Sequence, residues 1–373
     1  GPMAKVPVII SNEKCKIIVE QVKKCMNISK SDWDSFETSW NFKCHPLVSL
    51  KMAGAYAWGN NRLAMRIKSA YVAWEKLCEV CFYQLKQNEE ELNRIFIDIY
   101  GLQDELTPEV EDKDVTVRKA DLFRDIRSFV SYAVGCMLGR YSLDEEGLIY
   151  AGGEWDSSKY KTFLLDEDNC IPITDEEYFS DDIVGRFVEF VKTVYGADTL
   201  EENLDFIANA LGNKGDTSRE VIRNYFLKDF YADHLKVYQK RPIYWLFDSG
   251  KQNGFKALIY MHRYDADTVG RVRTDYLHRA QKYVETAMQS AQYTIDNASS
   301  ASEKSKATKA VTKYTKQLAE MKIYDEAIAH IANKRIEIDL DDGVKVNYAK
   351  FQGVEVAQEG KKALKVDLLA KIK

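Results

Sequence analysis

Apolar residues recur every three or four positions along most of the chain, which is the spacing of an amphipathic helix. The pattern predicts helices over about residues 12–26, 59–94, 118–138, 181–195, 199–211 and 218–234. Residues 29–32 offer capping side chains for a second short helix through Trp33, Phe36 and Trp40. The chain is therefore predicted to be mainly α, a multi-helix bundle.

Two β-prone runs interrupt this pattern in the second half of the chain. Residues 243–247 and 255–260 are apolar and aromatic, and the residues between them have the composition of a turn. They predict a β-hairpin near 243–260. After it, apolar steps of three and four residues on both sides of a polar break predict a long antiparallel helical hairpin near 264–332.

Two further stretches have a different composition. Residues 107–117 are polar and predict a linker, and residues 143–173 contain several glycines and short β-prone pieces. The second stretch predicts an irregular loop with a short hairpin.

Charge is distributed unevenly along the 373 residues, although the net charge is only -5. Residues 144–216 contain 19 acidic and 5 basic residues, whereas residues 217–324 contain 19 basic and 11 acidic ones. This partition indicates an acidic lobe and a basic lobe, and it is equally compatible with two solvated surfaces. A hydrophobic content of 45% excludes wholesale disorder.

The length of the chain and its local composition together predict several segments. They are a tag remnant at 1–3, an N-terminal helical region at 4–142, an acidic insertion at 143–216, a basic region with the β-hairpin and helical hairpin at 217–351, and a C-terminal tail at 352–373.

Neither a signal peptide nor a run of 18 apolar residues is present, so no membrane association is expected. Seven cysteines without regular spacing are typical of reduced thiols in a cytoplasm. Phosphate-loop, dinucleotide-binding, serine-hydrolase and zinc-protease motifs are missing. No Pro-Pro pair occurs, so the active-site loop of amino-methyltransferases that act on DNA bases, Asn or Asp followed by Pro-Pro and an aromatic residue, is absent as well. We therefore expect no catalytic and no cofactor-binding residue.

Metal binding is not expected either. Cys78 and Cys81 have ligand spacing, but they stand alone inside a predicted helix, where core packing is the favoured interpretation. Residues 339–343 lack the full ligand spacing of a calcium loop.

Basic residues around the β-hairpin are the candidates for DNA binding. They are Lys240, Arg241, Lys251, Lys256, Arg263, Arg271 and Arg273. Aromatic residues interleave with them, and charge combined with flat faces suits a phosphate backbone and its bases. A hairpin packed on a helix, with its basic side chains reaching to solvent, explains the pattern equally well. Four further lysines share one helix face, where a solvated face is favoured; they are Lys306, Lys309, Lys313 and Lys316.

Four blocks of sequence together resemble a known family. They are residues 32–46 (DWDSFETSWNFKCHP), 131–144 (SYAVGCMLGRYSLD), 240–264 (KRPIYWLF and, after the turn, GFKALIYMHRY) and 338–351 (IDLDDGVKVNYAKF). In this order they resemble the C-terminal region of the PglX family, the adenine-specific DNA methyltransferases of bacterial BREX phage-defence systems. Related blocks occur in single-chain type II restriction-methylation enzymes. The resemblance extends in patches from about residue 12 to the last residue.

The resemblance implies a non-catalytic region of a larger enzyme, because the family's methyltransferase and target-recognition domains precede these blocks. The parent would transfer a methyl group from S-adenosylmethionine to a flipped-out adenine. The implied partners are double-stranded DNA, those two domains and other BREX proteins. A basic helical region could clamp DNA through its phosphates. The alternative is a scaffold that docks other subunits through residues 144–216 without binding DNA.

Overall fold

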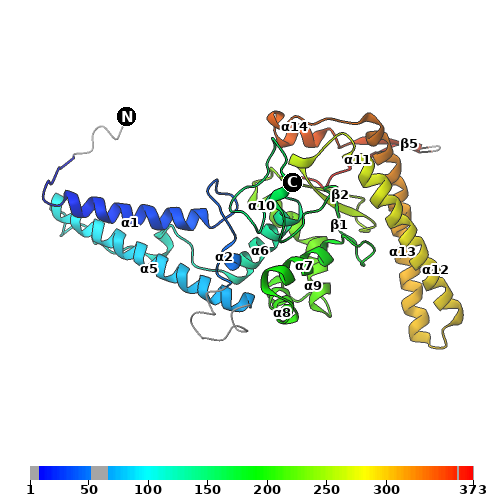
Figure 1. Ribbon diagram of the computed structural model, residues 1–373, viewed down its shortest axis with the longest axis horizontal. Coiled ribbons are helices and arrows are strands. Elements are labelled where there is room, and N and C mark those ends of the chain that lie inside the picture. The colour runs from blue at the N-terminus through cyan, green and yellow to red at the C-terminus, as the bar shows by residue number, and fades with distance from the viewer. Residues whose placement is uncertain (1–7, 52–65, 359–360, 373) are drawn as a thin grey trace. The chain divides into compact units, whose positions relative to one another are not determined.

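The computed structural model describes residues 8–51, 66–358 and 361–372, and helices dominate it (Figure 1). Contacts between residues separate the chain into two compact units, residues 1–128 and residues 129–373. The predicted mainly α fold class is confirmed. The finer segment boundaries expected from the sequence stay predictions.

Two long helices form the first unit. Helix α1 (Cys15–Asp34) packs along α5 (Ile67–Tyr100), and the short α2 (Pro46–Ser49) also contacts α5. Gly101 ends α5 in the left-handed conformation, with φ of 67°, which only glycine adopts without strain. The long helices form because their apolar residues recur on one stripe.

Three expectations for this unit need correction or completion. The second short helix after residues 29–32 is wrong, because α1 continues through them to Asp34 and the Ser35 hydroxyl bonds back to the Ser31 carbonyl. The predicted start of α5 near residue 59 lies outside the described residues. The expected linker contains a 3-10 turn, Asp112–Asp114. Its Val115 and Val117 pack against Phe82 and Leu85, which the mostly polar composition of the stretch does not indicate.

A three-stranded antiparallel sheet is the centre of the second unit. The strands are β1 (Ile171–Pro172), β2 (Tyr244–Asp248) and β3 (Lys256–Tyr260), in the order β1-β3-β2. Leu246 of β2 and Ile171 of β1 both pair with Leu258 of β3. The predicted β-hairpin is confirmed. Apart from Asp248 and Lys256 at the turn, its strands are apolar, because both faces of the sheet are buried.

The second unit also contains helices that pack on one another. They are α6 (Leu122–Met137), which contributes residues to both units, α7 (Ile183–Tyr195), α8 (Leu200–Leu211), α9 (Ser218–Lys228) and α10 (Phe230–Val237). The helix predicted over 218–234 is divided at Asp229, and the predicted cap is confirmed, because the Thr217 hydroxyl accepts from the Glu220 amide.

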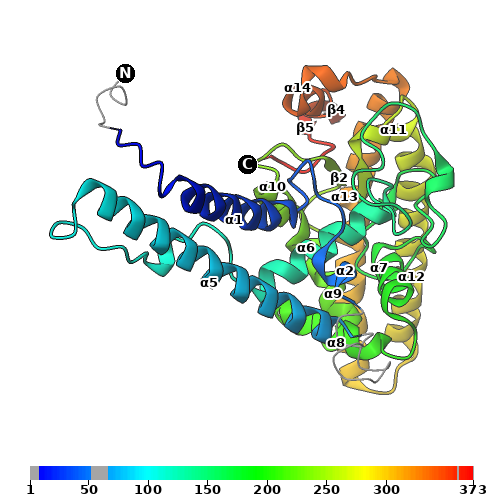
Figure 2. The same ribbon diagram turned by 60° about the vertical axis from the view of Figure 1, so that its left-hand side comes forward.

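The predicted long helical hairpin is confirmed, and α12 and α13 lie side by side in both views (Figures 1 and 2). It consists of α11 (Thr268–Arg271), a π-helical turn (Val272–Leu277), α12 (His278–Asn297) and α13 (Ala301–Lys334). One face of β2 and β3, including Trp245 and Ile259, shares a core with Met321 and Ile328 of α13. The hairpin is thereby anchored to the sheet at one end.

One expectation for this unit is wrong. No hairpin forms within residues 143–173: short turns such as Ser157–Lys159 precede β1, which pairs instead with β3 about ninety residues later. A short turn, Met261–Arg263, lies between β3 and α11. Near the C-terminus, the turn Leu340–Asp342 is followed by α14 (Val344–Ala349), β4 (Val354–Gln358) and β5 (Lys361–Val366), and β4 pairs with β5.

Candidate nucleic-acid interface

Three of the seven DNA-binding candidates are exposed. Lys240 and Arg241 follow α10, and Lys251 lies in the turn between β2 and β3. Lys240 and the preceding Gln239 both have positive φ, 60° and 50°, which turns the chain sharply before β2. Within the described ranges, none of the three side chains forms an ion pair. Their charges are therefore available to a ligand.

Lys256 is used inside the fold. Its side chain is buried, and its ammonium group donates to the Leu227 carbonyl at 3.1 Å and lies 3.4 Å from the Asp248 carboxylate. Burial raises the pKa of Asp248, and Lys256 opposes this effect. Lys256 thus neutralises a half-buried acid at the end of β2.

Arg263 holds a loop through backbone carbonyls. Its guanidinium donates to the carbonyls of Leu138, Asp166 and Glu167, at 3.2, 2.8 and 2.9 Å. It also lies 4.8 Å from the centre of the Trp155 ring. Burial lowers the pKa of Arg263. A guanidinium with this many internal partners acts as a structural clamp.

Arg271 and Arg273 pair with carboxylates. Arg271 lies 2.8 Å from Asp265, and Arg273 binds Asp325 of α13 through two nitrogens, at 2.8 and 3.2 Å. Burial would raise the pKa of Asp325, but hydrogen bonds from Arg273 and His278 lower it. Four of the seven candidates therefore have internal partners. Asp325 follows Arg273 by 52 residues, so no local sequence signal reveals that pair.

Most of the interleaved aromatic residues belong to the core. Tyr244, Trp245, Phe247, Phe255 and Tyr260 are all fully buried. Their rings pack inside the second unit and cannot stack on bases in this conformation. The exposed lysine and arginine side chains are the part of the predicted surface that could contact a phosphate backbone.

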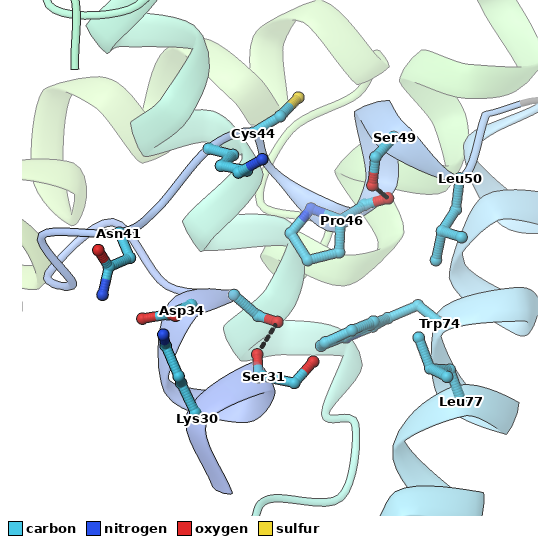
Figure 3. Close-up of a pocket in the computed structure, with 12 residues that line it drawn as sticks. Lys30, Ser31, Asp34, Asn41, Cys44, Pro46, Ser49, Leu50, Trp74 and Leu77 are labelled. Atoms are coloured by element: carbon cyan, nitrogen blue, oxygen red, sulfur yellow. Dashed lines mark hydrogen bonds between the residues drawn. The ribbon is translucent and has the colours of Figure 1, made fainter. Parts of the chain in front are cut away.

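The first unit contains a separate recess of about 490 Å³. Pro46, Trp74 and Leu77 gather on one side of it, whereas Lys30 and Asn41 lie on the other (Figure 3). We assign it no chemistry.

The described residues hold neither a cluster of three metal-ligating side chains nor a helix with the length and apolar character that crossing a bilayer requires. Burial raises the pKa of the Cys78 thiol to about 12, because its thiolate would be poorly solvated. At neutral pH this thiol is protonated, which disfavours metal binding by Cys78 and Cys81.

The described strands also do not fit a site for S-adenosylmethionine. Open α/β sheets bind nucleotide-like ligands at the carboxyl ends of parallel strands. Both described sheets are antiparallel, and the larger one is buried on both faces. No step of methyl transfer is therefore assigned to these residues.

Comparison with known proteins gives the chain its relatives. No family model matches it. The chain is 50% identical over 338 residues to the adenine-specific methyltransferase PglX of Lacticaseibacillus casei (strain Zhang), and this match covers 90% of the chain and 28% of that relative. It is 36% identical over 381 residues to the adenine-specific methyltransferase BrxX of Escherichia coli O9:H4 (strain HS), covering 94% of the chain and 30% of that relative. The chain is related to PglX and BrxX.

This relation confirms the resemblance carried by the four sequence blocks. The chain spans less than a third of the length of PglX and of BrxX. Adenine-specific methyl transfer is thus the named activity of proteins much longer than this match. That the match corresponds to their C-terminal region stays a prediction.

Proposed function

We propose that this chain is a non-catalytic C-terminal region of a DNA adenine-N6 methyltransferase in bacterial phage defence, and that it helps to clamp DNA and to organise the enzyme. The observation that carries the proposal is the 50% identity to PglX over 90% of the chain. In this proposal the enzyme acts in the cytoplasm, and S-adenosylmethionine binds to its separate methyltransferase domain. That domain, the target-recognition domain and other BREX proteins are the protein partners.

Clamping is a role that exposed cations can perform without catalytic groups. A methyltransferase must hold the duplex while a base leaves the stack. Contacts to phosphates position a protein on DNA and carry no sequence information. Lys240, Arg241 and Lys251 are exposed and lack an acidic partner within the described ranges, which supports such contacts.

The test is a titration of the chain against a labelled duplex of about 30 base pairs, by fluorescence anisotropy, from about 50 to about 200 mM NaCl. We expect weak binding whose affinity falls steeply with salt, since bound phosphates release counterions. Replacing Lys240 and Arg241 by Gln should flatten this dependence by about 1.8 in logarithmic slope. The matched control is Lys161→Gln with Lys345→Gln, which removes two exposed charges elsewhere.

Absence of binding at the lowest salt concentration would refute DNA clamping by this chain. Equal effects of the variant and its control would instead show that only net charge matters, and would remove Lys240 and Arg241 from the interface.

A scaffold that docks other parts of the enzyme, without DNA binding, is the second candidate. It is favoured by the exposed aromatic residues of the first unit: Trp40 is 97% exposed and Trp33 is 58% exposed. Large exposed apolar side chains often mark protein contacts. The partner would be the remaining length of an enzyme such as PglX, expressed separately. Trp40→Ser should weaken co-purification with it, and Tyr293→Ser, which removes a 70% exposed aromatic side chain from α12, serves as the comparison.

Deleting the acidic residues 144–158, which are largely exposed, tests the predicted docking segment in the same assay. Unchanged co-purification would count against docking through this part of the chain.

A further inference from the structure

Helix α13 carries a dense row of lysines. Between residues 304 and 316 the chain has five lysines and no acidic residue. At about 100° per residue, Lys306, Lys309, Lys313 and Lys316 lie within an arc of about 80°, and they extend over about 15 Å. The buried side chains of this stretch, such as Tyr314, face another direction.

Most of these charges lack an internal partner. Lys313 pairs with Asp175 at 2.5 Å, at the place where the acidic segment approaches α13. Lys306, Lys309 and Lys316 are exposed, and no acid pairs with them in the described part of the chain. This differs from Arg271 and Arg273, whose charges are both matched by carboxylates.

The acidic residue at the end of the row does not neutralise the lysines. Glu320 lies one turn beyond Lys316 on the same face of α13. Its carboxylate accepts hydrogen bonds from the Ser249 hydroxyl at 2.9 Å and from the amides of Gln252 and Gly254 at 2.8 and 3.3 Å. Because the turn between β2 and β3 occupies this carboxylate, it forms no ion pair with Lys316.

The same contacts bring a fifth lysine to the row. The Gln317 amide donates to the carbonyls of Gln252 and Asn253, at 3.2 and 3.3 Å. Gly254 permits this approach, since a Cβ there would lie 3.0 Å from the Gln317 carbonyl oxygen. Lys251 lies in this turn and is exposed. The turn therefore places Lys251 beside the end of the row.

The row also lies on a projecting element. In Figures 1 and 2, α12 and α13 extend together away from the strands that anchor them. A lysine row on such an arm can reach a long ligand that lies beside the second unit.

We propose that Lys251, Lys306, Lys309 and Lys316 form one phosphate-binding row that contacts the backbone of duplex DNA. The proposal rests on the DNA-clamping function above and adds the surface that performs it. B-DNA has a high density of phosphate charge along its axis, so a row of about 15 Å can contact more than one phosphate. Lysines are compact point charges on flexible stems, which suits contacts that hold DNA without reading bases.

The test compares two double variants of the chain. Lys309→Gln with Lys316→Gln removes two charges from the row. Lys304→Gln with Lys322→Gln removes two exposed charges from the same helix, about 160° away around its axis. Binding to the duplex is measured by anisotropy across the same salt series. All four side chains are exposed and unpaired in the described structure, so thermal midpoints should stay unchanged.

We expect the row variant to flatten the logarithmic salt dependence by about 1.8, since each lost phosphate contact contributes about 0.9. The control variant should leave it nearly unchanged. Equal effects of the two variants, or an unchanged slope in the row variant, would overturn the row while DNA clamping stands. Failure of the unmodified chain to bind DNA would overturn both.

An acidic protein is the competing ligand for a basic row. Binding of the chain to polyglutamate serves as the probe for it. If the row variant loses affinity for polyglutamate but keeps the full salt dependence on DNA, the row is a protein-docking surface and the DNA proposal is wrong.

Discussion

Removing the carboxylate of Asp182 tests how the acidic segment is held to α9 within the second unit. Asp182 is fully buried and begins α7, where it accepts hydrogen bonds from the amides of Val184 and Gly185 at 3.0 and 3.4 Å. Both of its oxygens also bind Arg223 of α9, at 2.7 and 2.8 Å. One side chain therefore caps a helix and neutralises a nearly buried cation.

The expected loss follows from these two roles. Replacing a helix cap by alanine costs about 1 kcal/mol. Leaving a buried charge without its partner costs about 3–5 kcal/mol, and the Arg223 side chain is only 13% exposed. Asp182→Ala should thus lower the free energy of unfolding by about 4–6 kcal/mol, a large part of the roughly 5–15 kcal/mol typical of a domain.

The assay is urea unfolding followed by circular dichroism at neutral pH. Glu201→Ala is the control, because it breaks the exposed ion pair with Arg219, whose side chain is 47% exposed, and should cost no more than about 1 kcal/mol. Adding Arg223→Met to Asp182→Ala should restore part of the stability, since no charge is then left unpaired. A loss below about 1.5 kcal/mol for Asp182→Ala would refute this account.

Three further outcomes are expected. Burial and the neighbouring Asp168 raise the pKa of Asp166, so this group stabilises the fold at low pH and the contribution is lost as pH rises above about 4, the ordinary value of an aspartate. Asp166→Asn should reduce that loss, seen as a pH-dependent difference in unfolding free energy from the unmodified chain. Thr217→Ala should lower the thermal midpoint through a cap loss of about 1 kcal/mol, and an unchanged midpoint would contradict the cap geometry. Glu320→Ala should speed amide exchange in the turn between β2 and β3, because two of its amides lose their acceptor; unaltered exchange at Gly254 would show that the turn does not depend on Glu320.

Local patterns predicted the helices and the hairpins well. The stripe of α5, the cap at Thr217 and the apolar runs around the turn at 248–254 each depend on neighbours within a few residues. Periodicity and turn composition record such neighbours directly. The same reasoning misplaced the short helix after residue 29, because a helix interior tolerates these capping side chains: Ser31 is exposed and Asp32 pairs with Arg118.

The candidate site shows the limit of this reasoning. Lys240 and Lys251 look the same in the sequence as Lys256, yet Lys256 is buried against Asp248 and the Leu227 carbonyl. Composition cannot show which charges are matched. The partner of Arg273 is Asp325, on the far helix of the hairpin.

The sequence by itself determined the mainly α class, the β-hairpin, the helical hairpin and the relation to PglX, because these depend on local spacing and on residue identity. Only the tertiary structure decided which cations remain for a ligand. The ion pairs of Arg271 and Arg273, the carbonyl clamp of Arg263 and the turn that occupies Glu320 all depend on side chains brought together by folding. A charge is available for binding only where the fold supplies no partner, and that partner can come from anywhere in the chain.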